Sequence, residues 1–250
     1  MIPADWPVWL ALLTIGAVMS AIVAVRYFLT SGLFAWLTTR LRPGLYDGLG
    51  DQIRAEVRHS LGAAVIYGVP AGIALYLWTH QGWTLLYTEW AAFPLWYLPA
   101  SLLIYLFVQD SWFYATHRAM HRSKRLFRWA HAVHHQSRPP TAWTAMSFHP
   151  LESLSGAIVI PLLVFIVPIH IAMLGIVLAV ATFMGVTNHM GWEIFPQRFV
   201  HSRLGSWVIT ASHHERHHEE YGCNFGLYFR FWDRLCGTDQ GLSQRIVRGQ

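Results

Sequence analysis

The chain has 250 residues, a length that suits one domain or one domain with a short appendage. Only 12% of its residues are charged, against about 25% in average soluble proteins, and 15% are aromatic. This composition excludes a disordered chain, a fibrous repeat and an ordinary soluble enzyme. Two cysteines, Cys223 and Cys236, are too few for a disulfide framework, so we interpret them as reduced packing residues.

Four uncharged apolar stretches follow one another along the chain. The runs 8–25, 61–79 and 90–108 each fall within the range of about 17–25 residues that lets a helix cross a bilayer. The stretch 153–192 is too long for one span, so we expect a helical hairpin bent near Pro168 that enters and leaves on the same side. The sequence therefore predicts an all-α integral membrane fold with three to four transmembrane elements, including this hairpin.

The first of these helices, within residues 1–30, is an N-terminal addition to the rest. Asp5 precedes its apolar run and no basic residue does, which is unlike a secretory signal. We therefore expect this helix to remain in the mature protein, and we treat residues 1–250 as a single domain.

Basic residues are unevenly distributed between the apolar stretches. The chain has a formal net charge of +5, and its Lys and Arg residues gather in 31–60, in 111–152 and after Met190, while 80–89 has none. The positive-inside rule then places the three basic segments in the cytoplasm. We interpret the basic excess as a signal for topology and for contact with anionic lipid. Nucleic acid is not an expected partner, because no binding motif accompanies these residues.

Histidine is the residue type that stands out, with 15 copies, nine of them in the windows 117–135 and 213–218. The first window opens with HxxxH, whose i and i+4 imidazoles share one helix face and can chelate one metal. It continues with HxxHH, in which adjacent histidines diverge by about 100° and could serve two metals. The second window repeats HxxHH, and one further histidine stands alone at the end of the hairpin. The nine candidate ligands are His117, His121, His131, His134, His135, His189, His214, His217 and His218.

The number of histidines limits the kind of metal site. Imidazole binds iron, zinc, copper and nickel alike, so the ligand type does not select the metal. A tetrahedral zinc takes four ligands, whereas eight or nine histidines suit two metals of higher coordination with positions left open. Open positions indicate catalysis, and both windows lie on the predicted cytoplasmic face, where they would form a catalytic cap.

Other metal chemistries fit less of the pattern. His214-Glu215-x-x-His218 also has the HExxH form of a membrane zinc metalloprotease with Glu215 as base, but that reading leaves the first HxxHH unexplained. Glu56-x-x-His59 is interpreted as a chance match to a di-iron bundle motif. A metal carrier would need ligands inside the spans, and the three single spans contain no charged residue or histidine.

The order HxxxH, HxxHH, single His and HxxHH resembles the fatty acid hydroxylase / sterol desaturase superfamily of integral membrane di-iron enzymes. The flanking sequences Trp-Phe-Tyr-Ala-Thr-His-Arg at 112–118, Ser-Phe-His-Pro-Leu-Glu at 147–152 and the stretch 224–238 support the resemblance. It covers roughly residues 50 to 240, with the histidine-rich catalytic region at 105–240. The phrases at 167–170 and around His149 are most similar to the sterol C5-desaturase (lathosterol oxidase) branch.

The resemblance implies a membrane enzyme that uses two irons, dioxygen and two electrons to hydroxylate or desaturate a lipid C–H bond. It makes the nine histidines iron ligands. Many relatives have a histidine where this chain has Gly185, so one iron loses a ligand here, or His213 or His149 compensates. The lipid could be a sterol, hopanoid, sphingoid, fatty acyl chain or carotenoid, and the choice between hydroxylation and desaturation stays open.

Groups around the ligands are expected to support this chemistry. Asp110, Glu152 and Asp233 are candidates to accept the far N–H of a ligating histidine. The chain has no haem, flavin or iron–sulfur motif, so we expect an external electron donor of the ferredoxin or cytochrome b5 type with its reductase. The basic residues Arg122, Lys124 and Arg125 are the expected docking patch for an acidic donor.

Overall fold

The computed structural model describes residues 6–247; residues 1–5, with Asp5, and 248–250 lie outside the described residues. Among the described residues, three helices are long and apolar enough to cross a membrane. They are α1 (Val8–Leu41), α2 (Gly50–Tyr76, continued by the π turn η1, Leu77–Gln81) and α6 (Ile171–His189). The chain is mostly helical and integral to the membrane, as the sequence predicts.

Helix α1 is longer than the predicted span 8–25. It continues through Arg26 to Leu41, and Pro43 and Gly44 follow, the latter with a φ of 86°. A proline cannot donate a backbone hydrogen bond and glycine accepts a left-handed conformation, so these two residues end the helix. The second half of α1, which carries Arg26 and Arg40, therefore extends beyond the predicted span as regular helix.

Helices α1 and α2 pack closely through small residues. A Cβ atom added at Gly72 would lie 2.8 Å from the Gly16 Cα, and one added at Gly68 would clash with Ser20. The Gly68-x-x-x-Gly72 pattern therefore brings two helices of the same chain together.

The predicted span 90–108 is wrong at its start. Residues 90–96 form turns around Pro94, and α3 begins at Tyr97 and ends at Arg122 (Tyr97–Arg122). The residue before a proline is disfavoured in helical conformation, which explains the late start. The second half of α3 is polar, so α3 is absent from the three apolar helices.

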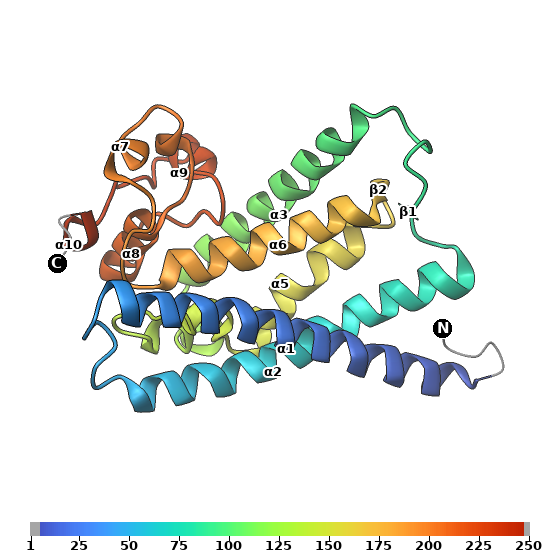
Figure 1. The fold of residues 1–250 in the computed structure, drawn as a ribbon, viewed down its shortest axis with the longest axis horizontal. Coiled ribbons are helices and arrows are strands. Elements are labelled where there is room, and N and C mark those ends of the chain that lie inside the picture. Colours follow the sequence, from blue (N-terminus) through green and yellow to red (C-terminus); the bar gives the residue numbers. More distant parts are fainter. Residues whose placement is uncertain (1–5, 248–250) are drawn as a thin grey trace.

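The predicted hairpin is present and bends at Pro168. Its first arm is α5 (Pro150–Leu163), which begins with Pro150 at the first helical position, a favoured place for proline. The short strand β2 (Ile169–His170) then leads into α6 and pairs in parallel with β1 (Leu86–Tyr87), a small departure from an all-helical fold. The two arms diverge from β2 (Figure 1).

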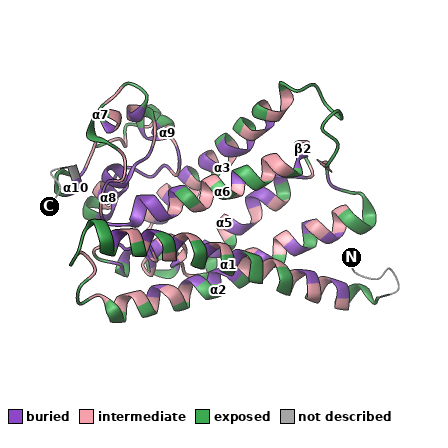
Figure 2. Ribbon diagram, viewed as in Figure 1, coloured by how far each residue is buried: buried purple, intermediate pink, exposed green. Residues whose placement is uncertain are grey.

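The remaining elements are short and cap one end of the helices, opposite β1 and β2 (Figure 1). They are α4 (Lys124–Leu126), η2 (Phe127–His131), η3 (His134–Gln136), η4 (Thr144–Met146), α7 (Gln197–Val200), η5 (Gly205–Trp207), α8 (Ala211–Glu220), α9 (Phe231–Leu235) and α10 (Gln244–Val247). Figure 2 shows that α8 and the adjoining end of α6 are buried, whereas α1 exposes residues along its length.

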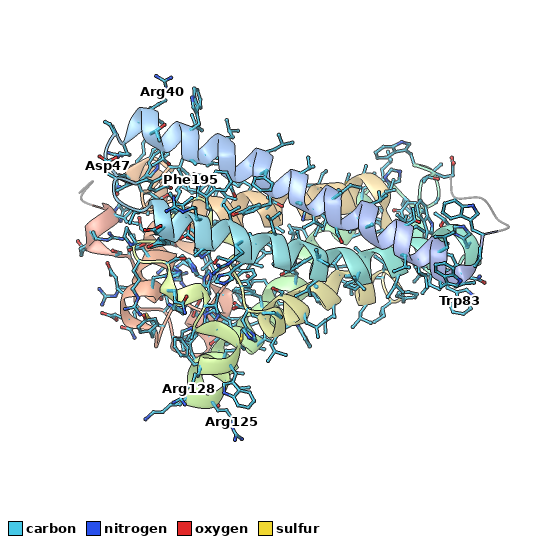
Figure 3. All side chains as sticks on the ribbon, turned by 90° about the horizontal axis from the view of Figure 1, so that it is seen from below. Arg40, Asp47, Trp83, Arg125, Arg128 and Phe195 are labelled. Carbon is cyan, nitrogen blue, oxygen red and sulfur yellow. The ribbon has the colours of Figure 1, made fainter. Side chains whose placement is uncertain are left out.

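Aromatic side chains mark the end of the molecule away from this cap. Trp9, Trp83, Trp90 and Trp96 are all exposed, a pattern typical of a membrane interface. Figure 3 shows Trp83 at one end, and Arg40 and Asp47 at the other. The basic loops and the short elements therefore lie at the same end of the helical bundle.

Candidate metal centre

Five elements bring the candidate histidines together at the capped end of the bundle. The last turns of α3 carry His117 and His121, and η2 ends at His131. The short turn η3 carries the next two histidines, α6 ends at His189, and α8 carries the second HxxHH. Within residues 6–247, the nine side chains gather in two groups whose candidate ligand atoms all lie within 4.8 Å of one another.

The five-histidine group joins α3, η2, η3 and α8. The Nε2 atoms of His117 and His131 lie 3.0 Å apart, and those of His121 and His135 lie 3.2 Å apart. His217 completes the group, with its Nε2 3.1 Å from the Nε2 of His135. All five rings therefore turn the same nitrogen toward one point.

The four-histidine group joins η3, α6 and α8. The His189 Nε2 lies 3.1 Å from the His134 Nε2 and 2.8 Å from the His214 Nε2. The His218 Nε2 lies 3.2 Å from the His214 Nε2. This group repeats the convergence of Nε2 atoms seen in the five-histidine group.

Consecutive histidines belong to different groups. His134 lies in the four-histidine group and His135 in the five-histidine group, with ring centroids 5.6 Å apart. His217 and His218 divide in the same way, also with centroids 5.6 Å apart. Each HxxHH segment therefore contributes to both groups, which places the two groups side by side, as the divergence of adjacent side chains predicts.

Backbone carbonyls fix the tautomers of three of the nine imidazoles. The Nδ1–H groups of His117, His217 and His189 donate to the carbonyls of Phe225 (2.9 Å), Cys223 (2.8 Å) and Gly185 (2.6 Å). A neutral imidazole carries only one N–H, so the Nε2 of each presents a lone pair to its group. A bound cation would satisfy these converging lone pairs.

Burial keeps the imidazoles in the form that binds metal. Removal from water lowers the pKa of His131, His214 and His217 well below its ordinary value, and neighbouring imidazoles lower it further. Neutral imidazole is the ligating form, so no proton has to leave these rings at neutral pH. The Nδ1 atoms of His134, His135 and His218 are buried without a hydrogen-bond partner among the described residues. The donor set, the tautomers and the charge state together fit two metal ions.

Comparison with known proteins identifies the family. The family model described as "Fatty acid hydroxylase" matches residues 102–238, which is more than half of the chain. The chain belongs to the fatty acid hydroxylase family. The resemblance drawn from the histidine pattern is thereby confirmed.

Several curated relatives of the chain are named as sterol enzymes. Human lathosterol oxidase is 26% identical over 203 residues, which cover 80% of this chain and 66% of that protein. The C-4 methylsterol oxidase of Schizosaccharomyces pombe is 32% identical over 153 residues, 59% of this chain and 50% of that protein. Rat methylsterol monooxygenase 1 is 29% identical over 154 residues, 60% of this chain and 50% of that protein. This family member therefore spans about half to two thirds of the length of these relatives. No solved structure matches the chain significantly.

Glu152 is the expected acidic neighbour that contacts a histidine. Its Oε1 lies 2.7 Å from the His131 Nδ1, on the ring edge opposite the converging Nε2 atoms. Both side chains are buried, and the Glu152 Oε2 has no partner among the described residues. Glu152 is therefore placed to fix the orientation of the His131 ring.

Asp110 and Asp233 differ from expectation, because in the described part of the chain neither carboxylate contacts a histidine. Asp110 accepts hydrogen bonds from the backbone N–H groups of the loop 227–229. Asp233 accepts from the N–H groups of Phe225 and Gly226 at 2.8 and 2.9 Å. Loop N–H groups lie closer to both carboxylates than any imidazole does. Asp233 thus supports the position of Phe225, whose carbonyl binds His117.

The two candidate extra ligands, His149 and His213, lie outside both groups. The His149 Nδ1 accepts from the N–H of Leu151 and caps α5. The His213 Nε2 lies 3.6 Å from the Asp239 Oδ1. Neither side chain replaces a ligand at Gly185, so the four-histidine group keeps one imidazole fewer than its neighbour.

Several contacts of the site carry no sequence motif. Tyr221, in a left-handed conformation with a φ of 57°, places its ring centroid 4.5 Å from that of His135. The guanidinium of Arg138 stacks on the Tyr221 ring, 4.9 Å from its centroid. Tyr221 directly follows α8, which carries the second HxxHH, and from this position its contact with the site could have been predicted. The carbonyls of Cys223 and Phe225 had no signal, because every residue has a carbonyl.

A cavity lies beside both groups, enclosed by α1, α2, α3, α5 and α6. Glu152 and Gly185 line it, as does Phe148, whose ring centroid lies 5.1 Å from that of His134. Apolar and aromatic side chains such as Trp112 and Phe113 form most of the wall. A long apolar molecule in this cavity would therefore approach the histidines from the membrane-embedded part of the protein.

Proposed function

We propose that this chain is a dioxygen-dependent di-iron enzyme that hydroxylates or desaturates a membrane lipid. The observation that carries the proposal is the pair of adjacent histidine groups, to each of which both HxxHH segments contribute ligands. A cavity lined by membrane helices lies beside them. Nine imidazoles exceed the four ligands of one zinc and suit two irons with coordination positions left open. Gly185, which provides no imidazole, lines the cavity, so an iron held by the four-histidine group would be accessible from there.

Iron at the two groups would supply the oxidation of a lipid C–H bond by dioxygen, with two electrons and two protons consumed per turnover. The chain's own residues position and shield this chemistry. The carbonyls of Phe225, Cys223 and Gly185 hold three imidazoles in the ligating tautomer, and Glu152 holds a fourth ring in orientation. The largely apolar and aromatic wall of the cavity would hold the lipid beside the histidines and limit the access of water.

The remaining parts of the proposal follow from the chain's relatives and its charges. The relatives' names favour a sterol-like lipid as the first substrate to test, with hopanoid, sphingoid, fatty acyl and carotenoid lipids as further classes. Electrons would come from a separate ferredoxin or cytochrome b5 type donor and its reductase. We place the histidine groups on the cytoplasmic side, because the basic segments share that end of the bundle. Residues 1–250 would act as one domain with its catalytic region at 105–240.

The zinc protease alternative finds less support in the geometry. A protease would need Glu215 free to activate water, but its carboxylate forms an ion pair with Arg245 of α10. It would also leave the five-histidine group without a role. The family assignment favours the oxidase as well.

Metal content is the decisive experiment. We expect the detergent-purified protein from iron-57-grown cells to contain about two irons per chain and to show the Mössbauer signal of a coupled pair. One tightly bound zinc without iron, even after anaerobic iron loading, would overturn the proposal. In that case Glu215→Gln should abolish peptide hydrolysis and His131→Ala should have little effect.

A further inference from the structure

Arg26 is an isolated charge in the membrane part of the chain. Of the 18 Lys and Arg residues, it alone lies outside the basic segments 31–60, 111–152 and the region after Met190. At ~1.5 Å per residue it lies roughly 27 Å along α1 from Val8, close to the ~30 Å thickness of a bilayer's hydrocarbon core. Arg26 therefore lies near the far boundary of that core, at a depth that the polar group of a lipid can reach.

No protein group neutralises Arg26 within residues 6–247, where it makes neither an ion pair nor a hydrogen bond. The arginines that pair with carboxylates there are Arg54, Arg216, Arg230, Arg234 and Arg245. Arg26 is half-buried and lines the cavity beside the histidine groups, together with Tyr67 and Gln109. The cavity wall therefore contains an unpaired guanidinium.

Arg26 belongs to the lining of two hollows. It lines a shallow apolar groove on the outer face of α1, together with Val18, Ile22, Val25 and Leu29. Glu152, in contrast, is only 5% exposed and contacts His131. A lipid in the groove or in the cavity would therefore meet Arg26, and one in the cavity would also lie beside the histidine groups.

We propose that Arg26 binds an anionic oxygen group, a carboxylate or a phosphate, on the lipid that enters the cavity. The planar guanidinium donates paired hydrogen bonds that match both anions. A neutral hydroxyl, such as that of a free sterol, would leave the charge uncompensated. Among the lipid classes proposed above, Arg26 therefore favours an acyl or phosphorylated lipid over the sterol-like class. By fixing one end of the lipid, Arg26 determines which carbon lies beside the histidine groups. This inference rests on the proposed function, because it takes the occupant of the cavity to be the substrate.

The test measures binding and requires neither iron nor turnover. The full-length protein in a non-ionic detergent is titrated with dibromostearic acid, the matched dibromostearyl alcohol and the matched dibromostearyl phosphate. Bromine quenches tryptophan fluorescence at contact, and Trp112 lines the cavity. The part of the quenching that is lost in Trp112→Phe reports the cavity, and the part that remains reports detergent-exposed tryptophans.

We expect the acid or the phosphate to bind roughly tenfold or more tightly than the alcohol, as one charge-assisted hydrogen bond would give. Arg26→Gln should remove this preference and Arg26→Lys should retain part of it. Arg40→Gln, at the exposed end of the same helix (Figure 3), should leave the preference unchanged. A tighter acid identifies a carboxylate lipid, and a tighter phosphate identifies a phospholipid.

Equal binding of all three probes to the unaltered protein would overturn the proposal, and so would an anion preference that persists in Arg26→Gln. If Arg26→Gln fails to fold, the three probes on the unaltered protein and on Arg26→Lys still decide the question. Iron content separates this inference from the proposed function. Two irons without anion preference would refute only the role of Arg26, and anion preference without iron would refute only the di-iron enzyme.

Discussion

The His131 Nδ1 lies 2.7 Å from the Glu152 Oε1, and both side chains are buried at the junction of η2 and α5. The opposite nitrogen of the same ring points into the five-histidine group, 3.0 Å from the His117 Nε2. A carboxylate that accepts the far N–H of a ligating imidazole fixes the ring and increases its basicity. The contact therefore links the first arm of the hairpin to the proposed metal site.

Replacing this carboxylate should weaken metal binding without changing the side chain's size. We expect Glu152→Gln to lower iron affinity by about 10–100-fold, the usual cost of losing such a contact. The measurement is competition with an iron chelator, monitored by elemental analysis. Glu89→Gln, at an exposed position in the loop before α3, is the matched control. Equal iron affinity in both variants would contradict the role of Glu152.

The two histidine groups should lose their metals separately. We expect His121→Ala, in the five-histidine group, and His189→Ala, in the four-histidine group, each to reduce iron from about two to about one per chain. The coupled Mössbauer signal should disappear in both, because coupling needs two irons. The exposed His80→Ala serves as control. Complete loss of iron from either single variant would show that the groups do not bind independently.

The interface between α1 and α2 should tolerate no added side chain where the two helices pack most closely. Gly68→Ile would force the helix away from Ser20, and we expect a loss of about 1–3 kcal/mol or more, as for overpacked cores. Gly62→Ile changes the same helix where nothing lies within 4 Å of an added Cβ atom. Thermal unfolding in detergent gives the Tm of both variants. Equal Tm values would show that close packing of α1 against α2 does not determine the stability of the protein.

An acidic electron donor should depend on the exposed basic surface around α4 and η2. Figure 3 shows Arg125 and Arg128 projecting from this region, and the Phe127 ring between them lies 5.3 Å from that of His121. Reversing the charges of Arg122, Lys124 and Arg125 should raise KM for the donor about tenfold, since close charge pairs contribute about 1.5 kcal/mol or more. Turnover with a small chemical reductant should be unchanged.

Two controls test this prediction: a change of ionic strength, and charge reversal at a different part of the exposed surface. High ionic strength should weaken the unaltered protein's interaction with the donor toward the level of the variant, because exposed charges are screened. Reversal of Arg198 and Arg203, exposed on another part of the cap, should leave KM for the donor unchanged. An equal effect of both sets would indicate that only net charge matters, which would contradict a docking patch.

Features that depend on local periodicity could be predicted from the residues alone. Uncharged runs of bilayer length predict the membrane helices, and a proline within a long run predicts the bend at Pro168. The spacing of HxxxH and HxxHH fixes the directions of neighbouring side chains, so the separation of His134 from His135 was predictable before any contact was known. These properties follow from the rotation per residue of a helical backbone.

Which distant residues meet follows from the packing of the helices. The packing pairs His189 with His214, gives Glu152 but neither Asp110 nor Asp233 a histidine contact, and places Arg26 in the wall of the cavity. All three carboxylates carry the same chemistry in the sequence. Their neighbours depend on how α3, α5 and the loop after α8 pack, because contacts between segments far apart in the chain are set by packing and not by spacing.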